Sequence, residues 1–134
     1  MKGNCMQKFR VLFLDDMSER HARFSQMYYQ LLDIKHVYNY KDCIKALQEE
    51  KFHTIYLDHD LCIEDILVSP DDTSKEKTGT DVCNWMVSNL NPNTTAEVIV
   101  HSLNPGGAQR MVSILNEAGF EAICYPFTLF RRVH

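Results

Sequence analysis

The chain has 134 residues, of which 45% are hydrophobic and 24% are charged, and its formal net charge is −4. This size and composition predict one globular domain, residues 1–134, with a core large enough to fold without disulfides or a structural metal. No apolar run reaches the roughly 20 residues that a membrane-spanning helix needs, and the acidic balance argues against an extended nucleic-acid surface. The N-terminal residues contain no apolar signal segment and the five cysteines form no C-x-x-C pair, so we expect a cytoplasmic protein with reduced thiols.

Strand-like and helix-like patterns alternate along the chain. In order, the sequence predicts a strand at 9–16, a helix at 18–32, a strand at 36–40, a helix at 41–51, a strand at 53–61, a helix at 80–90, a strand at 96–102, a helix at 106–119 and a strand at 120–127. Residues 62–78 are charged and aperiodic, so we expect a mobile surface loop there, serving as a lid or as a partner surface. The residues after 127 suffice for a turn or two of helix at most.

This alternation predicts an α/β fold: a single doubly wound, flavodoxin-like or receiver-like sheet of five parallel strands, with the last helix short or missing. Ligands of such folds bind outside the carboxyl ends of the strands. Polar side chains follow three of the predicted strands, at Asp15 and Asp16, at Asp58 to Asp60, and at His101 to Asn104. We therefore expect these stretches to converge on one site.

Carboxylates brought together in this way repel one another unless a cation relieves them. Oxygen ligands and water are what Mg²⁺ or Mn²⁺ prefers, so we expect such an ion beside Asp15, Asp16 and Asp58. His59 and His101 add two groups that exchange protons near neutral pH.

The loop and helix start after the fourth predicted strand suit an anion such as phosphate. Free backbone N–H groups and the helix dipole favour negative charge at a helix N-terminus. The candidate phosphate contacts are Ser102, Asn104, the amides of Gly106 and Gly107, and Arg110.

Each of these features also has a purely structural interpretation. An aspartate after a strand commonly caps a helix, and a glycine pair is common in strand-to-helix turns. Three ionisable groups in succession, as in Asp58 to Asp60, are harder to explain without a partner or ligand. The remaining histidines, His21, His36, His53 and His134, are expected to be solvated.

The "FLDD" segment, the aspartate ending the third strand, Ser102 and the late Pro-Phe resemble the receiver domain of two-component response regulators. That resemblance implies Mg²⁺ at the acidic residues and phosphoryl transfer to Asp58. Receivers carry a lysine just before the fifth-strand proline, where this chain has Tyr125, and this departure weakens the phosphoryl-signalling interpretation.

A closer resemblance is to the cyclic-phosphate processing receiver domain family. Its motifs correspond here to "FLDDMSER" (13–20), "YLDHDL" (56–61), "TGTDVCNWM" (78–86) and "VHSLNPGGAQRM" (100–111). The resemblance implies a metal-aided phosphoesterase acting on cyclic phosphates, such as nucleoside or RNA-terminal 2′,3′-cyclic phosphates.

The resemblance also implies roles for single residues. Asp15, Asp16 and Asp58 would hold the metal, and either His59 or His101 would protonate the departing sugar oxygen while the other activates water. Asp60 and Asp81 would orient the histidines. The substrate side would comprise Ser102, Asn104, Gly106, Gly107 and Arg110, with Arg20, Thr78 and Asp81 added from the motifs.

Two other classes of function remain open from the sequence. The chain could be an atypical receiver that docks a signalling partner without chemistry, or a protein that binds a cyclic nucleotide without cleaving it.

Overall fold

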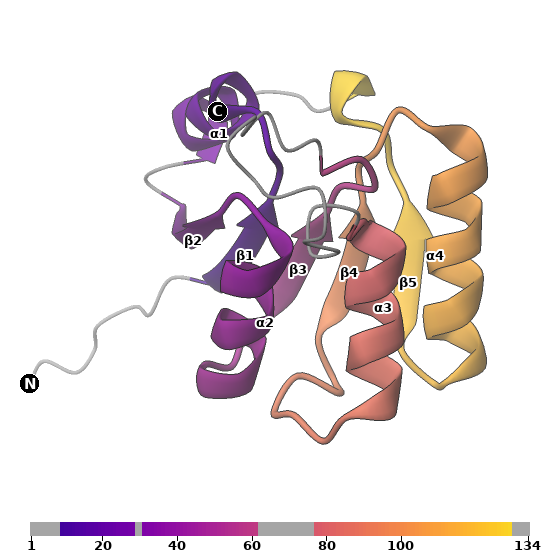
Figure 1. The fold of residues 1–134 in the computed structure, drawn as a ribbon. Helices are drawn as coiled ribbons and strands as arrows, with labels where there is room; N and C mark the ends of the chain where they lie inside the picture. Colours follow the sequence, from indigo (N-terminus) through magenta and orange to yellow (C-terminus); the bar gives the residue numbers. More distant parts are fainter. Residues whose placement is uncertain (1–8, 29–30, 62–76, 130–134) are drawn as a thin grey trace, which may run out of the picture.

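The structure, a computed structural model, describes residues 9–28, 31–61 and 77–129 (Figure 1). Its elements are β1 (Phe9–Leu14), α1 (Ser18–Tyr28), β2 (Leu32–Val37), α2 (Tyr40–Glu49), β3 (Thr54–Leu57), α3 (Gly79–Ser88), β4 (Glu97–Val100), α4 (Pro105–Glu117), β5 (Glu121–Cys124) and the 3₁₀ helix η2 (Phe127–Leu129). Residues 62–76 of the expected loop at 62–78 lie outside the described residues, and so does His134.

The five strands form one parallel sheet in the order β2-β1-β3-β4-β5, which confirms the predicted α/β fold. The register pairs Leu14 with Val37 at one edge, and Leu57 with Val100 and Val100 with Cys124 toward the other. The carboxyl ends of β1, β3 and β4 therefore lie side by side, with β3 between the other two. This arrangement brings the three polar stretches to one edge of the sheet.

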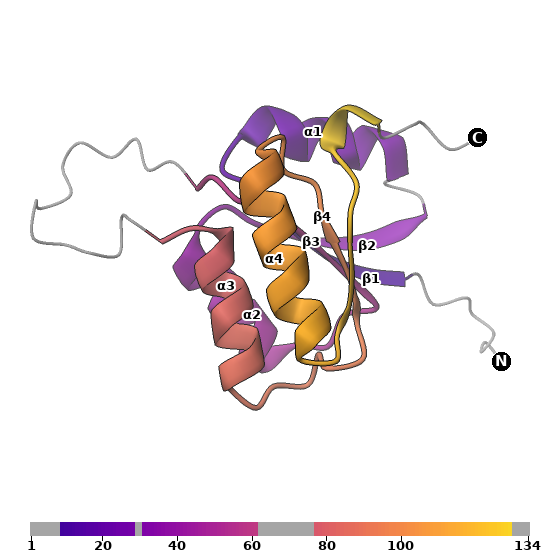
Figure 2. The ribbon, with the colours of Figure 1, turned by 90° about the vertical axis from the view of Figure 1, so that its right-hand side faces the viewer.

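Helices cover both faces of the sheet, with α2, α3 and α4 on one face and α1 with η2 on the other (Figures 1 and 2). The residues of β1 alternate between the two sides, as the period of a strand requires. Leu12 and Leu14 join the core under α2, α3 and α4, whereas Val11 and Phe13 pack with Phe24 of α1 on the other face. A strand buried on both faces explains the nearly unbroken apolar run at 11–14.

Short polar side chains fix where three helices begin. The Asn39 side chain accepts a hydrogen bond from the backbone N–H of Asp42 at the start of α2. Asn104 does the same for Gly107 at the start of α4, where Pro105 occupies the first helical position. Helix α3 begins with a capping box between Thr78 and Asp81.

The second strand and the first helix differ from prediction. Strand β2 covers Leu32–Val37 rather than 36–40, and α1 ends at Tyr28 rather than at 32. The alternation of apolar and polar residues in "LDIKHV" suits an edge strand that is half buried, and pairing with all six residues of β1 sets its position.

The predicted helix at 80–90 extends too far at its C-terminal end. Helix α3 ends at Ser88, the following residue is extended, and Leu90 is fully exposed.

Two further sequence expectations can be compared with the described residues. Cys43 and Cys83 are buried free thiols and Cys124 is an exposed one. No helix in the described part of the chain is long and apolar enough to cross a membrane.

Candidate functional site

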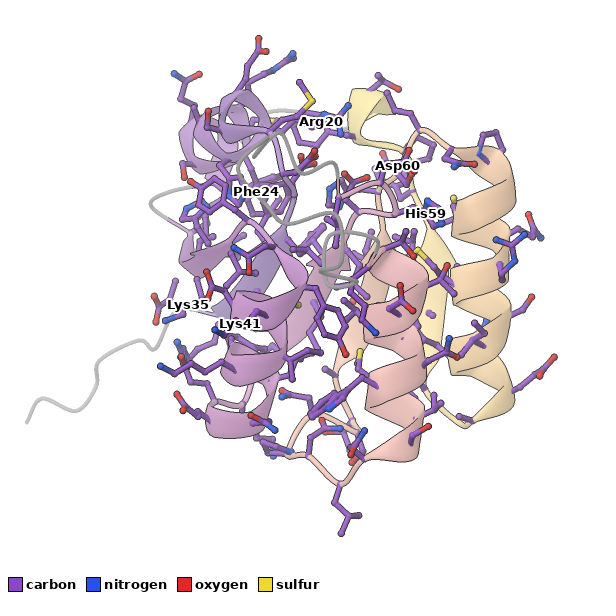
Figure 3. The ribbon with its side chains drawn as sticks, viewed as in Figure 1. Arg20, Phe24, Lys35, Lys41, His59 and Asp60 are labelled. Atoms are coloured by element: carbon purple, nitrogen blue, oxygen red, sulfur yellow. The ribbon has the colours of Figure 1, made fainter. Side chains whose placement is uncertain are left out.

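A pocket of about 520 Å³ opens at the carboxyl edge of the sheet. The described residues that line it come from the loops after β1, β3 and β4 and from the first turns of α1 and α4. They are Asp16, Met17, Arg20, Asp58, Asp60, Ser102, Leu103, Asn104 and Pro105. Figure 3 shows Arg20, His59 and Asp60 at this edge, far from Lys35 and Lys41. The convergence expected from the strand ends is thus present.

Asp15 lies behind the pocket and is completely buried. Its Oδ1 accepts a hydrogen bond of 2.8 Å from the backbone N–H of Met17. Its Oδ2 lies 2.9 Å from Nε2 of His101 and 3.2 Å from Nη1 of Arg20. Burial raises the pKa of this carboxyl, but the hydrogen bonds from His101 and Met17 and the charge of Arg20 outweigh it and leave the pKa below its usual value.

Asp58 follows β3 and forms part of the pocket lining, with a side chain only 4% exposed. Its Oδ1 accepts a hydrogen bond from the backbone N–H of His59. Burial and the nearby charges of Asp15 and Asp16 raise its pKa to about 7, and Arg20 offsets only part of this effect. Asp58 is therefore a buried carboxyl beside two other acidic groups, and a bound cation would stabilise its ionised form.

His101, at the end of β4, supports Asp15 from inside the protein. Its ring is fully buried and stacks on Phe13, with the ring centroids 4.9 Å apart and the planes 8° from parallel. Burial lowers its pKa despite the hydrogen bond and charge of Asp15, so the imidazole is neutral near pH 7 and donates from Nε2 to Asp15. Neither His101 nor His59 is among the described residues that line the pocket.

His59 lies nearer to solvent and makes a different set of contacts. Its Nδ1 is 2.7 Å from Oδ1 of Asp60 and 3.4 Å from Nδ2 of Asn104, and both of these partners line the pocket. The ring packs over the first turn of α4, where a Cβ added to Gly107 would come within 2.6 Å of it. A residue larger than glycine at position 107 would displace His59.

Two further residues of the predicted substrate side serve to start α3. The backbone N–H of Thr78 donates to Asp81 at 2.7 Å, and the Thr78 hydroxyl accepts from the N–H of Thr80. The hydrogen bonds described for Asp81 thus go to Thr78 and not to a histidine, and neither residue lines the pocket. Their capping box places Gly79 so close to β3 that an added Cβ would lie 2.1 Å from the carbonyl oxygen of Asp58, which explains the Thr-Gly-x-Asp pattern.

The remaining predicted residues divide between the pocket and the surface. Ser102 is buried, lines the pocket and accepts a hydrogen bond from the backbone N–H of Asn104. Gly106 and Arg110 are exposed on α4 and do not line the pocket. Tyr125, which replaces the lysine of receivers, is 40% exposed.

Two histidines expected to be solvated instead form a pair beneath the site, and that expectation is wrong. His21 is only 3% exposed, and its Nδ1 lies 2.6 Å from Nδ1 of His36. Its Nε2 donates to the carbonyl oxygen of Asp15 at 2.8 Å, and Nε2 of His36 contacts the hydroxyl of Ser25. The pair thus holds the backbone at Asp15 in place. The periodicity of a single helix or strand does not predict this pair, because the two rings come from different elements. His53, another of these histidines, is exposed, as expected.

The acidic residues suit a hard divalent cation. Asp15, Asp58 and His101 each offer one ligand atom, and these atoms lie within 4.8 Å of one another. Asp16 adds a carboxylate on the pocket side. His101 is already bonded to Asp15, so the oxygen atoms of the three aspartates are the donors that fit Mg²⁺ or Mn²⁺.

Several solved structures that are similar to this chain are receiver domains. The receiver domain of a sensor histidine kinase from Pseudomonas aeruginosa, with a magnesium ion in its active-site cleft, has a TM-score of 0.65 at 14% identity, covering 94% of this chain and 89% of that one. A CheY-like receiver domain from Methylobacillus flagellatus has a TM-score of 0.64 at 14% identity, with 90% and 86% covered. The receiver domain of a response regulator from Bermanella marisrubri has a TM-score of 0.60 at 20% identity, with 94% and 90% covered. Comparison with curated protein sequences finds no match.

The five-stranded parallel sheet, with its acidic cluster at the carboxyl edge, has the fold of CheY-like receiver domains. The sequence profile of the cyclic-phosphate processing receiver domain matches residues 10–117. The chain therefore belongs to that family, as the motifs indicated.

Proposed function

We propose that this domain is a metal-dependent phosphoesterase that opens cyclic phosphates, of the nucleoside or RNA-terminal 2′,3′-cyclic phosphate class. The observation that carries the proposal is the composition of the pocket. One cavity presents the carboxylates of Asp16 and Asp58 together with a guanidinium, from Arg20, and with Ser102 and Asn104. Its volume of about 520 Å³ is within the range of small-molecule sites.

The metal would be Mg²⁺ or Mn²⁺, held by Asp16 and Asp58 from the pocket and by Asp15 from behind. When bound, such an ion neutralises phosphate charge and lowers the pKa of water. The raised pKa of Asp58, to about 7, supports this assignment because burial and the charges of Asp15 and Asp16 disfavour its ionised form, which a bound cation would stabilise.

The phosphate would be held by Arg20, Ser102 and the side-chain amide of Asn104. These three groups come from α1 and from the loop after β4, so they approach from both sides of Asp58. The backbone N–H of Gly107 already donates to Asn104, and Arg110 is exposed, so we place both of them outside the phosphate contacts.

Of the two histidines, the contacts favour His59 as the proton donor. His101 is buried and donates to Asp15, which makes it a positioning residue. His59 is 13% exposed, and Asp60 holds its Nδ1, which leaves Nε2 to exchange the proton. In the proposed reaction a water oxygen forms a new bond to phosphorus and the bond from phosphorus to one sugar oxygen breaks. The proton of the water passes to solvent, and His59 donates a proton to the departing oxygen.

A second candidate is a signalling receiver that accepts a phosphoryl group at Asp58 or docks a partner. The fold of the relatives and the place of Asp58 at the end of β3 favour it. Tyr125 at the position of the receiver lysine argues against it. Binding of a cyclic nucleotide without cleavage is the third possibility that the same pocket allows.

The test is incubation of the purified protein with Mg²⁺ or Mn²⁺ and a panel of 2′,3′- and 3′,5′-cyclic nucleotides and RNA ending in a cyclic phosphate. Asp58→Ala is the matched control. Ring opening that requires both the metal and Asp58 supports the esterase. Binding with full recovery of intact ligand identifies a binding protein, and labelling of Asp58 by a small phosphodonor identifies a signalling receiver.

A further inference from the structure

Arg20 occupies the space between the two buried carboxylates of the site. Its Nη1 lies 3.2 Å from Oδ2 of Asp15 and 3.7 Å from Oδ2 of Asp58. Those two side chains are 0% and 4% exposed, while the Arg20 side chain is 21% exposed. Within the described ranges, no other arginine or lysine forms an ion pair with either carboxylate.

Asp15 has little capacity left for another ligand. A carboxylate offers about four acceptor positions. The Met17 amide uses one on Oδ1, and His101 and Arg20 share Oδ2. The His101 bond is buried, and the Met17 bond comes from a backbone amide that cannot swing away as a side chain can. The Arg20 bond, from a side chain that lines the pocket, is therefore the one that an arriving ion can replace.

The Arg20 side chain has another contact available when it leaves Asp15. Its guanidinium carbon already lies 5.9 Å from the centroid of the Phe127 ring, and the ring face attracts cations. The side chain lines the pocket beside Asp58, so a swing toward the pocket does not open the core.

We propose that Arg20 is a stand-in cation that holds Asp15 and Asp58 together until a divalent ion takes its place, and that the released guanidinium then binds the phosphate in the pocket. The first half concerns the metal alone, and the second half rests on the proposed phosphoesterase function. Two cations cannot share the same carboxylate oxygens at these distances without strong repulsion, so metal and Arg20 compete. The order of events follows: metal first, then phosphate.

The first half is tested by titrating the full chain with Mn²⁺ alone and following the free-ion signal by electron paramagnetic resonance. The titration is done at low ionic strength and at the same pH for every variant. Arg20→Gln is expected to bind Mn²⁺ about tenfold or more tightly than the wild type, because a competing charge is removed. Equal or weaker binding by Arg20→Gln overturns the proposal.

Arg23→Gln is the matched control. Arg23 lies on the same helix and has its guanidinium carbon 5.8 Å from the same Phe127 ring, but no ion pair of its own with Asp15 or Asp58 is described. Its loss changes the net charge equally, so its Mn²⁺ affinity is expected to stay within about twofold of wild type. An equal gain in both variants would show a general charge effect and would overturn a local role for Arg20.

Arg20→Lys is a second control, which keeps the proposal testable if the glutamine variant misfolds. It keeps the charge, so it is expected to keep Mn²⁺ affinity near the wild-type value. A gain in Arg20→Lys equal to that in Arg20→Gln would contradict the proposal, because charge would then not be the cause.

The second half is tested by calorimetry with 2′,3′-cyclic AMP at saturating Mn²⁺, with Arg20 and Arg20→Gln compared in a His59→Ala background, in which the ligand is turned over slowly. Arg20→Gln is expected to bind this ligand about tenfold more weakly than the protein that keeps Arg20, the reverse of its effect on the metal. Unchanged affinity overturns the second half alone. Tighter Mn²⁺ binding with no cyclic-phosphate binding by any variant leaves the stand-in role intact and counts against the proposed function.

Discussion

Nε2 of His101 lies 2.9 Å from Oδ2 of Asp15, and both side chains are completely buried. The contact joins the end of β4 to the end of β1, across β3. His101 therefore sets the position of a carboxylate that solvent does not reach.

Replacing His101 tests this positioning role. His101→Ala removes a ring stacked on Phe13 and leaves a buried carboxylate with one donor fewer. We expect a loss of about 2–4 kcal/mol in the free energy of unfolding, measured by urea denaturation. His101→Gln places an amide N–H near the position of Nε2 and should lose clearly less. A loss below about 1 kcal/mol for the alanine variant would show that the contact contributes little.

Replacing His59 separates chemistry from stability. His59 is partly exposed and contacts Asp60 and Asn104 at the pocket, so His59→Ala should change the free energy of unfolding by less than about 1 kcal/mol. Turnover of a cyclic phosphate should fall about 10²-fold or more, the usual worth of a general acid. Steady-state kinetics that show a near-normal rate would remove His59 from the mechanism.

Asp58 makes stability depend on pH in an unusual direction. Its pKa is raised from 3.8 to about 7, so between about pH 4 and 7 the folded state binds a proton that the unfolded state does not. The contribution of Asp58 to stability therefore falls as pH rises through this range, by up to about 4 kcal/mol. Burial lowers the pKa values of His21, His36 and His101, and these groups make stability fall as the pH is lowered. The contribution of Asp58 must therefore be isolated with a variant.

Asp58→Asn is that variant, since it keeps the acceptor for the His59 amide without the charge. At pH 8.5 we expect it to be about 2–4 kcal/mol more stable than the wild type, and at pH 4 the difference should disappear. Thermal or urea unfolding at both pH values measures it. A difference that does not vary with pH would show that the carboxyl titrates normally.

Gly107 tests how closely His59 is packed. Gly107→Ala raises helix propensity by about 1 kcal/mol, but the new Cβ would come within 2.6 Å of the His59 ring. We expect no net gain in stability and a displaced imidazole, seen as a changed His59 signal in NMR spectra. In Gly106→Ala, the added Cβ meets nothing closer than 3.9 Å, so the His59 signal should stay in place. Equal His59 spectra in the two variants would contradict the packing described here.

The convergence of the three polar stretches could be predicted from the sequence because each of them follows the end of a strand. A buried strand that stops at Asp15, another at Asp58 and a third at His101 must meet at one edge once the sheet is parallel. The parts that sequence reasoning missed depend on contacts between elements. The His21–His36 pair requires the register of β2, and β2 was misplaced because its polar residues obscure the strand pattern. The bridge from Arg20 to both carboxylates depends on how α1 packs, which helical periodicity alone does not specify.

The most direct test of the central claim is a ³¹P NMR time course of a nucleoside 2′,3′-cyclic phosphate with the wild-type protein and Mg²⁺, beside Asp58→Asn and a sample with chelator. The account predicts that the cyclic-phosphate resonance is replaced by that of one phosphomonoester, only in the wild-type sample with metal. The position of the product resonance also identifies which sugar oxygen departs. A cyclic-phosphate signal that persists unchanged in all three samples, across the nucleosides tried, would contradict the assignment of this site as a phosphoesterase.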